Sequence, residues 1–334
     1  MEEVHEEGWL ALDIGAKSHA WACDLDGHGE AGTVDNTPAE LHTLLAACTG
    51  RVRHLRVLVE ATGVYYLDVA LLAHALGAAV MVVNPRVAHH FAQALNQRNK
   101  TDKLDAKMLL ECLRRMPFRA WQPPRESWLQ LRDYGRFLVQ LTEAGTAARN
   151  RLHALSSTRT SPAFLITELK RMLAGNDRRI ARVRAKAVAL IRTDPYLQQR
   201  FEALCTIQGV AETSAVSLLS ELVTLPPTLS SRACVCHAGL DPRVFESGTS
   251  VHKAPRISHR GNKYLRRALF HPALSAATHD PGAHAFKQRL IDRGKKKMQA
   301  NVAIMRKLLT AAWAIMKDPQ PYDTHRLYPT LKNA

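Results

Sequence analysis

Four carboxylates in the first third of the chain have the residue types and the spacing to bind divalent cations. Asp13 ends a short apolar run, and Glu60 ends a second one. Asp102 and Asp105 lie three positions apart at the start of an expected helix, so both project from one helix face. Carboxylate oxygens are the ligands that Mg²⁺ prefers, and two such cations can hold a phosphate for in-line displacement. The pattern therefore favours metal-dependent phosphodiester chemistry.

Each of these acids also has a structural explanation when taken alone. Asp102 and Asp105 suit the N-cap and first turn of a helix, where negative charge is stabilising. Asp13 precedes Gly15 by two positions and suits a turn. The set of four on one α/β frame is harder to explain by turns and caps, so metal binding is the favoured interpretation.

The segments around these acids alternate short apolar runs with amphipathic stretches, which predicts an α/β domain. In an open sheet of this kind, ligands gather beyond the carboxyl ends of the strands, where Asp13 and Glu60 lie. The stretch Asp26-Gly27-His28-Gly29 predicts a hairpin. The expected strands cover 9–14, 19–25, 56–59 and 79–83, and the expected helices 39–47, 65–76, 87–95 and 103–115.

The rest of the chain is predicted to be mostly helical. Long helices are expected over 128–155 and 163–192, and two such helices suggest a helical hairpin or coiled-coil arm that dimerises or acts as a spacer. A glycine turn at 205–211 enters an apolar helix through 222, which is either half of a helix-hairpin-helix or an ordinary junction. A basic loop over 243–267 is expected, with closing helices at 264–277 and 300–316.

Charge is distributed unevenly along the 334 residues, which carry 46 Lys+Arg, 30 Asp+Glu and a net charge of +16. Residues 1–120 carry 12 Lys+Arg and 15 Asp+Glu, so the remaining 214 carry 34 and 15, a net charge of +19. A slightly acidic first domain suits metal binding, whereas the basic remainder suits a polyanion such as nucleic acid. A basic face that is merely solvated is the alternative for any single cluster.

Ser247 is the candidate nucleophile in the basic part. It precedes Lys253, Arg256 and Arg260, which would surround a phosphate with positive charge. Ser-Gly is a common turn pair and no activating histidine is evident nearby, so spacing alone favours a turn residue.

Motifs from both halves resemble the IS110 family of transposases, a family of DNA recombinases. The resemblance to its RuvC-like DEDD domain rests on Leu12-Asp13-Ile14-Gly15, Val59-Glu60-Ala61-Thr62-Gly63, Val83-Asn84-Pro85 and Asn99-Lys100-Thr101-Asp102 through Asp105-Ala106. The second half matches in order at Ile207-Gln208-Gly209-Val210, Ala238-Gly239-Leu240, Phe245-Glu246-Ser247-Gly248, Arg256-Ile257-Ser258, Arg260-Gly261-Asn262-Lys263 and Leu265-Arg266-Arg267-Ala268-Leu269. The resemblance extends from about residue 9 to 320.

The resemblance implies a RuvC/RNase H-like α/β domain at 1–122, a helical coiled-coil dimerisation arm at 123–200, and a mostly helical transposase domain at 201–322 followed by a tail. It implies Mg²⁺ or Mn²⁺ on Asp13, Glu60, Asp102 and Asp105, and Ser247 as the nucleophile that forms a 5′-phosphoserine link with DNA. Thr249 and Ser250 are lesser candidates for that role. The implied active centre is composite, formed between subunits of a dimer or tetramer.

The implied partners are donor DNA, target DNA and a structured bridge RNA whose loops pair with both. Base pairing would then select the sequence, while the protein contacts backbone and shape. The expected nucleic-acid contacts are Arg149, Arg151, Lys253, Arg256, Arg260, Lys263, Arg266 and Arg267. Further basic candidates are Arg178, Arg179 and the run Lys295-Lys296-Lys297.

Two other readings of the chain remain open from the residues. One is a metal-dependent nuclease or Holliday-junction resolvase in which Ser247 is incidental, and the other is a non-catalytic nucleic-acid-binding protein. A tyrosine recombinase is disfavoured because no Arg-His-Arg-Tyr constellation occurs in its usual order. The cluster Cys234-Val235-Cys236-His237 has no second ligand pair at zinc spacing, so we expect core residues there.

Composition and termini indicate the compartment. Six cysteines are too sparse for a disulfide scaffold, and 46% hydrophobic residues suffice for buried cores. No run approaches eighteen apolar residues, and the first seven residues are acidic where a signal peptide would be basic. We expect a protein of the bacterial cytoplasm, associated with the nucleoid when active and with no membrane partner.

Overall fold

The structure of the chain is a computed structural model that describes residues 5–95, 102–247, 251–258 and 260–329. The chain divides into two compact units, Met1–Pro123 and Pro124–Ala334. Within the described ranges, no helix is both long and apolar enough to cross a membrane.

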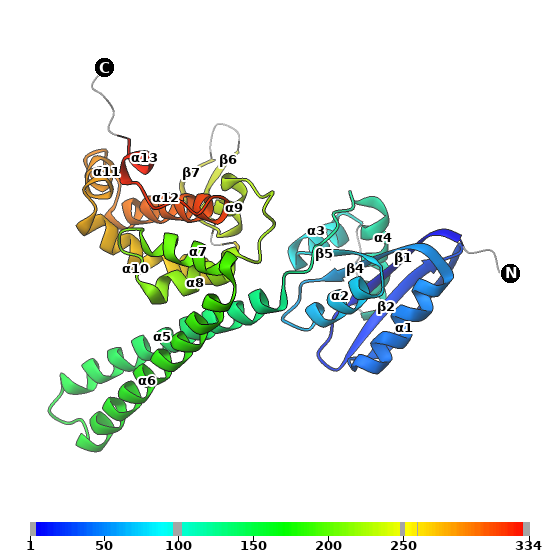
Figure 1. Ribbon diagram of the computed structural model, residues 1–334, viewed down its shortest axis with the longest axis horizontal. Helices are drawn as coiled ribbons and strands as arrows, with labels where there is room; N and C mark the ends of the chain where they lie inside the picture. Colours follow the sequence, from blue (N-terminus) through cyan, green and yellow to red (C-terminus); the bar gives the residue numbers. More distant parts are fainter. Residues whose placement is uncertain (1–4, 96–101, 248–250, 259, 330–334) are drawn as a thin grey trace. The chain divides into compact units, whose positions relative to one another are not determined.

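The first unit is a mixed five-stranded sheet with helices on both faces (Figure 1). Its strands are β1 His5–Asp13, β2 Ser18–Leu25, β3 His28–Asp35, β4 Val52–Glu60 and β5 Ala79–Val83, in the order β3-β2-β1-β4-β5. β1, β2 and β3 pair antiparallel, whereas β4 is parallel to both β1 and β5. The helices are α1 Pro38–Arg51, α2 Tyr66–Ala75, α3 Pro85–Ala94 and α4 Asp102–Arg115. This architecture fits an α/β nuclease-like domain.

Local sequence explains where these elements begin and turn. Asp26 and Gly27 have φ angles of 60° and 75°, the conformation of a tight hairpin turn, and Leu25 pairs with His28 across it. The predicted hairpin is therefore confirmed, with β3 as a strand that the apolar pattern did not reveal. The Thr37 hydroxyl accepts a hydrogen bond from the Glu40 backbone N–H and caps α1.

Two hydrophobic clusters cover the two faces of this sheet. On one face, Leu10, Leu12, Val57 and Val59 pack with residues of α1 and α2 such as Leu45. On the other face, the alternate strand residues pack with α3 and α4. They include Ala11, Ala20, Ala22, Leu58 and Met81, and their helical partners include Ala88, Ala106, Leu109 and Leu113. Successive residues of a strand point to opposite faces of the sheet, so neighbours such as Leu10 and Ala11 belong to different clusters.

The second unit begins with two long antiparallel helices, α5 Glu126–Ser156 and α6 Ala163–Thr193, which lie side by side (Figure 1). Each has 31 residues and is therefore about 46 Å long. Midway along the pair, the buried Asn176 side chain donates to the Leu141 carbonyl at 2.9 Å. A buried polar contact of this kind fixes the register of one helix against the other. The helical hairpin predicted for this region is confirmed.

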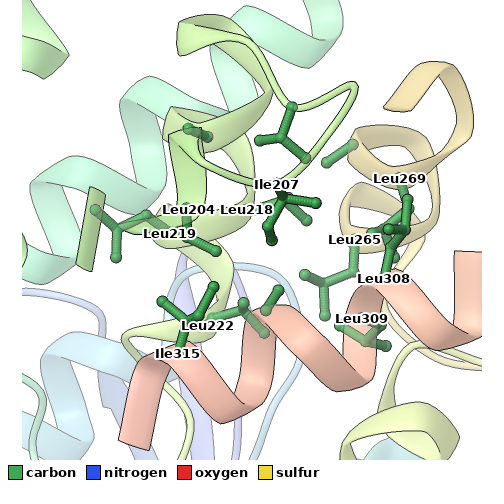
Figure 2. Packing of buried hydrophobic residues seen from close by; sticks show 14 of the residues in the cluster. Leu204, Ile207, Leu218, Leu219, Leu222, Leu265, Leu269, Leu308, Leu309 and Ile315 are labelled. Carbon is green, nitrogen blue, oxygen red and sulfur yellow. The ribbon is translucent and has the colours of Figure 1, made fainter. Parts of the chain in front are cut away.

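The remainder of the second unit is a helical bundle with one two-stranded ribbon. Its elements are α7 Pro195–Cys205, α8 Glu212–Leu222, α9 Ser231–His237, β6 Pro242–Ser247, β7 Val251–Ile257, α10 Lys263–His279, α11 Pro281–Asp292, α12 Lys297–Lys317 and α13 Thr324–Leu327. Figure 2 shows the core, where leucines of α8, α10 and α12 meet around Ile207. The apolar helix and the closing helices that the sequence predicted are confirmed.

The expectation of a basic loop over 243–267 is wrong. Residues in this stretch form the antiparallel ribbon of β6 and β7, in which Pro242 pairs with Ile257, and α10 begins at Lys263. A two-stranded ribbon encloses no core, so its strands need no apolar face. The charged residues and the proline of this stretch therefore concealed the strands from a reading based on hydrophobic pattern.

Candidate active site

The carboxyl ends of two adjacent parallel strands bring two of the predicted acids to one edge of the sheet. β1 and β4 pair in a register that places Leu12 opposite Val59, and Asp13 and Glu60 follow as the last residue of each strand. Asp13 lies two positions after Ala11, and Glu60 two after Leu58. Both of those neighbours pack on the α4 face, so alternation directs both acids to that face.

Helix α4 packs on the same face of the sheet through Ala106, Leu109 and Leu113. Near its carboxyl end, the Arg114 guanidinium forms an ion pair with Asp24 and lies 5.5 Å from the centre of the Trp9 ring. Asp105 is nine residues before Arg114, about 13.5 Å along a helix, and Asp13 is four residues beyond Trp9, about 13 Å along a strand. Asp105 and Asp13 thus lie at about equal distances along their own elements from the contact of Arg114 with Trp9.

The side chains at this edge differ in their surroundings. Asp13, Glu60 and Asp105 are all half-buried, and Glu60 Oε1 accepts a hydrogen bond from the Thr62 hydroxyl at 2.8 Å. Asp102 is the first residue of α4, but its side chain lies outside the described residues. Among the side chains that are described, no three His, Cys, Asp or Glu residues form a group that could hold a metal ion. The fold therefore brings Asp13 and Glu60 to neighbouring strand ends, but it does not bring them and Asp105 together as a metal-binding group among the described side chains.

The loop that follows Asp13 is shaped by a buried histidine. The Gly15 backbone N–H donates to His19 Nδ1 at 3.2 Å, and burial lowers the pKa of His19 from its ordinary value of 6.5. His19 is therefore neutral at pH 7, which an accepting Nδ1 requires. This contact orders the turn between β1 and β2 beside the acidic edge.

Ser247 is the last residue of β6 and pairs with Val251 of β7. Its side chain lies outside the described residues, as do Thr249 and Ser250. At the other end of the ribbon, the Ser258 hydroxyl donates to Asp241 Oδ1 at 2.8 Å and accepts from the Arg260 backbone N–H at 3.3 Å. The ribbon is thus held at its base, and its tip carries the candidate nucleophile.

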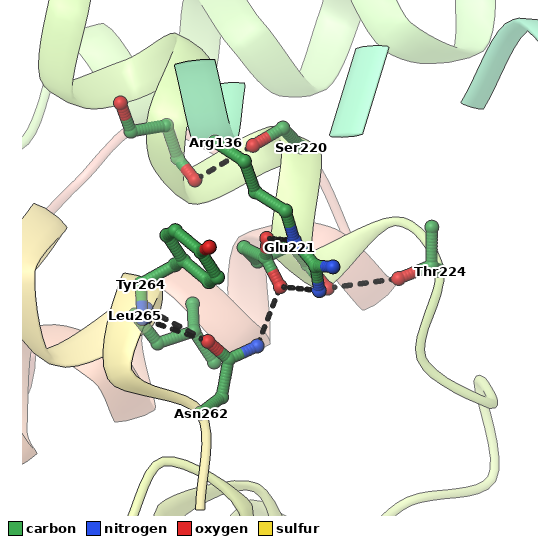
Figure 3. A network of polar contacts seen from close by, with 8 residues as sticks. Arg136, Ser220, Glu221, Thr224, Asn262, Tyr264 and Leu265 are labelled. Carbon is green, nitrogen blue, oxygen red and sulfur yellow. Dashed lines mark hydrogen bonds and ion pairs between the residues drawn. The ribbon is translucent and has the colours of Figure 1, made fainter. Parts of the chain in front are cut away.

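A buried polar network joins the start of α10 to α5 and α8 (Figure 3). The Arg136 guanidinium donates to both oxygens of Glu221 at 2.6 and 3.1 Å, and Asn262 Nδ2 donates to the same carboxylate. Asn262 Oδ1 accepts from the backbone N–H groups of Tyr264 and Leu265, which caps α10. Sequence reasoning missed this network, although an acid among the leucines of α8 was a visible signal.

A groove of about 1140 Å³ lies between α5, α8, α10, α12 and the ribbon, and we call it the α10 groove. Its apolar lining includes Val139, Leu240, Phe270, Leu290, Met298 and Val302. Its cationic lining is Arg256, Lys263, Arg266, Arg267, Lys295 and Arg306. Four of the expected nucleic-acid contacts therefore line one groove.

The other expected contacts lie elsewhere. Arg149 forms an ion pair with Asp177 at 3.4 Å on the long helical hairpin, and Arg151 lies nearer its tip. Arg260 is exposed next to the ribbon, and the side chain of Lys253 lies outside the described residues.

The cysteine cluster divides between core and surface. Cys234 is fully buried, and burial raises its pKa to about 12, so it is an uncharged core residue as expected. Cys236 is exposed, so the expectation of a core residue is wrong there. Two residues apart on a helix, positions 234 and 236 of α9 differ by about 200° around its axis, so their side chains point in different directions.

Two family profiles cover most of the chain. The DEDD_Tnp_IS110 profile, described as Transposase, matches residues 10–157, which include the sheet, its acidic edge and α5. The profile described as Transposase IS116/IS110/IS902 family matches residues 201–288, which include the ribbon and α10. Fold and profiles together define a DEDD-type transposase.

Individual relatives agree with the profiles. The chain is 31% identical over 274 residues to the pilin gene-inverting protein of Moraxella bovis, covering 80% of this chain and 82% of that protein. The pilin gene-inverting protein of Moraxella lacunata gives the same identity and coverage. An IS110 insertion element protein of Streptomyces coelicolor is 33% identical over 125 residues, covering 36% of this chain and 30% of that protein. The chain belongs to the IS110 family of transposases and is a DNA transposase or recombinase.

Proposed function

We propose that the protein cuts and rejoins donor and target DNA through a covalent link to Ser247, with divalent cations held by Asp13, Glu60, Asp102 and Asp105. The observation that carries the proposal is the shared edge of β1 and β4. It brings Asp13 and Glu60 to the sheet face on which the Asp105 turn lies. The proposal is also supported by the family membership, because both the acidic edge and the ribbon fall within matched segments.

The acids fit Mg²⁺ or Mn²⁺ by the chemistry of their donors. Asp13, Glu60 and Asp105 offer hard oxygen ligands, and each is half-buried rather than fully solvated. A bound divalent cation would withdraw charge from a phosphate oxygen and so assist attack on phosphorus. The acids in turn hold their positions through the strand ends and the start of α4.

In the proposed reaction, Ser247 Oγ forms a bond to phosphorus and loses its proton. The bond from phosphorus to the 3′ oxygen breaks, and the leaving 3′ hydroxyl takes up a proton. The product is a 5′-phosphoserine. Attack by a 3′ hydroxyl of another strand then reverses these changes and restores Ser247. Because the phosphodiester energy is conserved in the serine ester, joining needs no nucleotide cofactor.

The test is an adduct assay on radiolabelled element-end DNA with the full-length protein and Mg²⁺. We expect a protein–DNA adduct with the wild type, none with Ser247→Ala, and a strong reduction with Asp13→Asn or Glu60→Gln. Ser250→Ala is the matched control and should retain the adduct. Hydrolysed DNA ends with no adduct would instead favour the metal-dependent nuclease or Holliday-junction resolvase. Activity that survived in Asp13→Asn and Glu60→Gln would contradict a catalytic role for the acids.

We propose that a bridge RNA selects the DNA sites through base pairing. The net charge of +19 beyond residue 120 supports a large polyanionic partner, and the second unit carries this excess. Arg178 and Arg179 on α6 add to the basic surface of the long hairpin. The test is recombination between element ends and target, with and without the flanking non-coding RNA. Equal activity in both conditions would contradict the need for a guide.

We also propose that the hairpin of α5 and α6 joins subunits into a dimer, and that two dimers form a tetramer on DNA. Its tip exposes apolar side chains, with Phe164 69% and Met172 49% exposed, beside a hollow lined by Leu155 and Leu169. A second copy would bury this patch. Phe164→Asp combined with Met172→Asp should shift the protein toward monomer in sedimentation. An unchanged sedimentation coefficient would refute the role of the tip.

We propose that each of three segments of the chain has its own role. Residues 1–122 supply the metal-binding acids, 123–200 the contact between subunits, and 201–322 the nucleophile and most contacts to nucleic acid. Since its substrate is cellular DNA, we propose that the protein acts in the bacterial cytoplasm at the nucleoid. Fractionation of cells that express the tagged protein tests this placement.

A further inference from the structure

The α10 groove carries positive charge that the described part of the chain leaves uncompensated. Of its six lining cations, only Arg267 has an ion-pair partner among the described residues, Glu143 at 2.9 Å. Among the residues that the structure describes, Glu143 is also the single acid that lines the groove. The remaining five cations face a shared space, so an anion that entered it would be attracted from several sides.

Arg266 is the groove cation whose surroundings most favour an anionic ligand. Its guanidinium is half-buried and donates a hydrogen bond to the neutral Ala238 carbonyl at 2.9 Å. Burial lowers the pKa of Arg266, and the adjacent Arg267 adds to this effect. A partly desolvated cation next to another cation is unfavourable unless a counter-charge joins it. The groove therefore gains stability from a ligand with negative charge.

The apolar lining distinguishes among anionic ligands. Phe270, Val302 and Met298 line the same space, and Met298 is 57% exposed. A DNA duplex presents phosphates and sugars outward and keeps its base faces stacked inside, so it would leave these side chains in water. An unpaired strand offers base faces together with phosphates, which matches an apolar surface bordered by cations. The volume of about 1140 Å³ exceeds what one small ligand needs.

The groove is continuous with the ribbon that carries Ser247. Pro242 of β6 and both Arg256 and Ile257 of β7 are among its lining residues. Ser247 lies five residues along β6 from Pro242, a distance of about 17 Å in a strand. One DNA strand can therefore occupy the groove and reach the tip of the ribbon.

We propose that the α10 groove binds an unpaired segment of the DNA strand that reacts at Ser247, with bases on the apolar lining and phosphates on Arg266 and its neighbouring cations. The choice of DNA rests on the proposed function, in which Ser247 attacks DNA. A groove for an unpaired strand next to the cleavage point would keep the cut end separated from its complement, ready for joining to a new strand.

The test measures binding of fluorescein-labelled dT12, a 12-base-pair duplex and rU12 to the full-length protein by anisotropy. EDTA is present, so neither cleavage nor the acidic edge contributes. Two groove variants, Met298→Asp and Arg306→Glu, are compared with two matched variants outside the groove lining, Leu274→Asp and Arg293→Glu. All four positions are exposed, and circular dichroism checks that each variant is folded.

We expect the groove variants to weaken dT12 binding about tenfold or more and to change duplex binding less than about threefold. The matched variants should change neither by more than about twofold. Unchanged dT12 binding in both groove variants, or equal losses for dT12 and duplex, would overturn the proposal. Binding of rU12 about tenfold tighter than dT12, with the same sensitivity to the groove variants, would assign the groove to RNA and also overturn it.

This experiment is independent of the proposed reaction at Ser247. Ser247→Ala should bind dT12 as the wild type does, because the groove and not the serine binds the strand. If no adduct formed with wild-type protein but the groove variants lost dT12 binding, the proposed covalent link at Ser247 would be contradicted and strand binding in the α10 groove would be supported. If the adduct formed but the groove variants bound dT12 as the wild type does, the covalent link at Ser247 would be supported and strand binding in the groove would be contradicted.

Discussion

Replacing Glu221 by Ala tests whether the buried network truly positions α10. The Glu221 side chain is 2% exposed and accepts three hydrogen bonds, two from Arg136 and one from Asn262. Removing one partner of a buried ion pair costs about 3–5 kcal/mol, because the remaining partner loses its opposite charge in a desolvated site. The Arg136 side chain is 31% exposed, so solvent screens part of the loss and about 3 kcal/mol is expected.

Urea denaturation of the wild type, Glu221→Ala, Arg136→Met and the double variant measures this loss as a double-mutant cycle. A loss of about 3 kcal/mol corresponds to about 6–12 °C in Tm for a unit of this size. The double variant should be more stable than the sum of the single losses predicts, because the contact between the two side chains is lost once but is counted in both single losses. A loss below about 1 kcal/mol in Glu221→Ala, or strict additivity, would refute the reasoning.

Three further predictions concern the sheet, a turn and the metal. His19 has a lowered pKa, so its stabilising contribution is present above pH 6.5 and is lost as the pH falls below that value; urea titrations should show this loss in the wild type and not in His19→Gln. Gly209 has a φ of 91°, and an added Cβ would lie 2.6 Å from the Pro272 carbonyl oxygen. Gly209→Ala should therefore lower the free energy of unfolding by about 2 kcal/mol or more. Gly175→Ala is the control and should not destabilise the protein, because a Cβ there would meet open space. Mn²⁺ at about 100 times its Kd should stabilise the wild type by about 2.7 kcal/mol in thermal unfolding, and an equal gain in Asp13→Asn would contradict metal binding at the acidic edge.

The sequence was most informative where an element has a buried face. The helices of the first unit, and its strands other than β3, were predictable because apolar residues such as Leu10 and Leu12 alternate or recur at helical spacing. Asp13 and Glu60 were predictable for the same reason, since each interrupts an apolar run at the point where its strand ends. The acidic edge could thus be anticipated from single strands before the pairing of β1 with β4 was known.

The ribbon and the α10 groove could not be anticipated in the same way. The ribbon encloses no core, so no apolar period marks β6 and β7. The groove combines side chains from α5, α8, α10 and α12, and only their packing brings these distant segments together. Glu221 was visible as an acid among leucines, but its partners Arg136 and Asn262 lie 85 and 41 positions away. Such pairings depend on tertiary structure and leave no local pattern.

Mass spectrometry of the protein–DNA adduct tests the central claim most directly. The full-length protein would be incubated with element-end DNA and Mg²⁺, and the adduct then digested with nuclease and protease. We predict that a 5′-nucleotide remains attached to the peptide containing Ser247, with fragment ions that locate the phosphate on that serine. A nucleotide on Thr249, on Ser250 or on a residue outside the ribbon would contradict the assignment of Ser247 as the nucleophile. Cut DNA with no modified peptide would contradict covalent catalysis altogether.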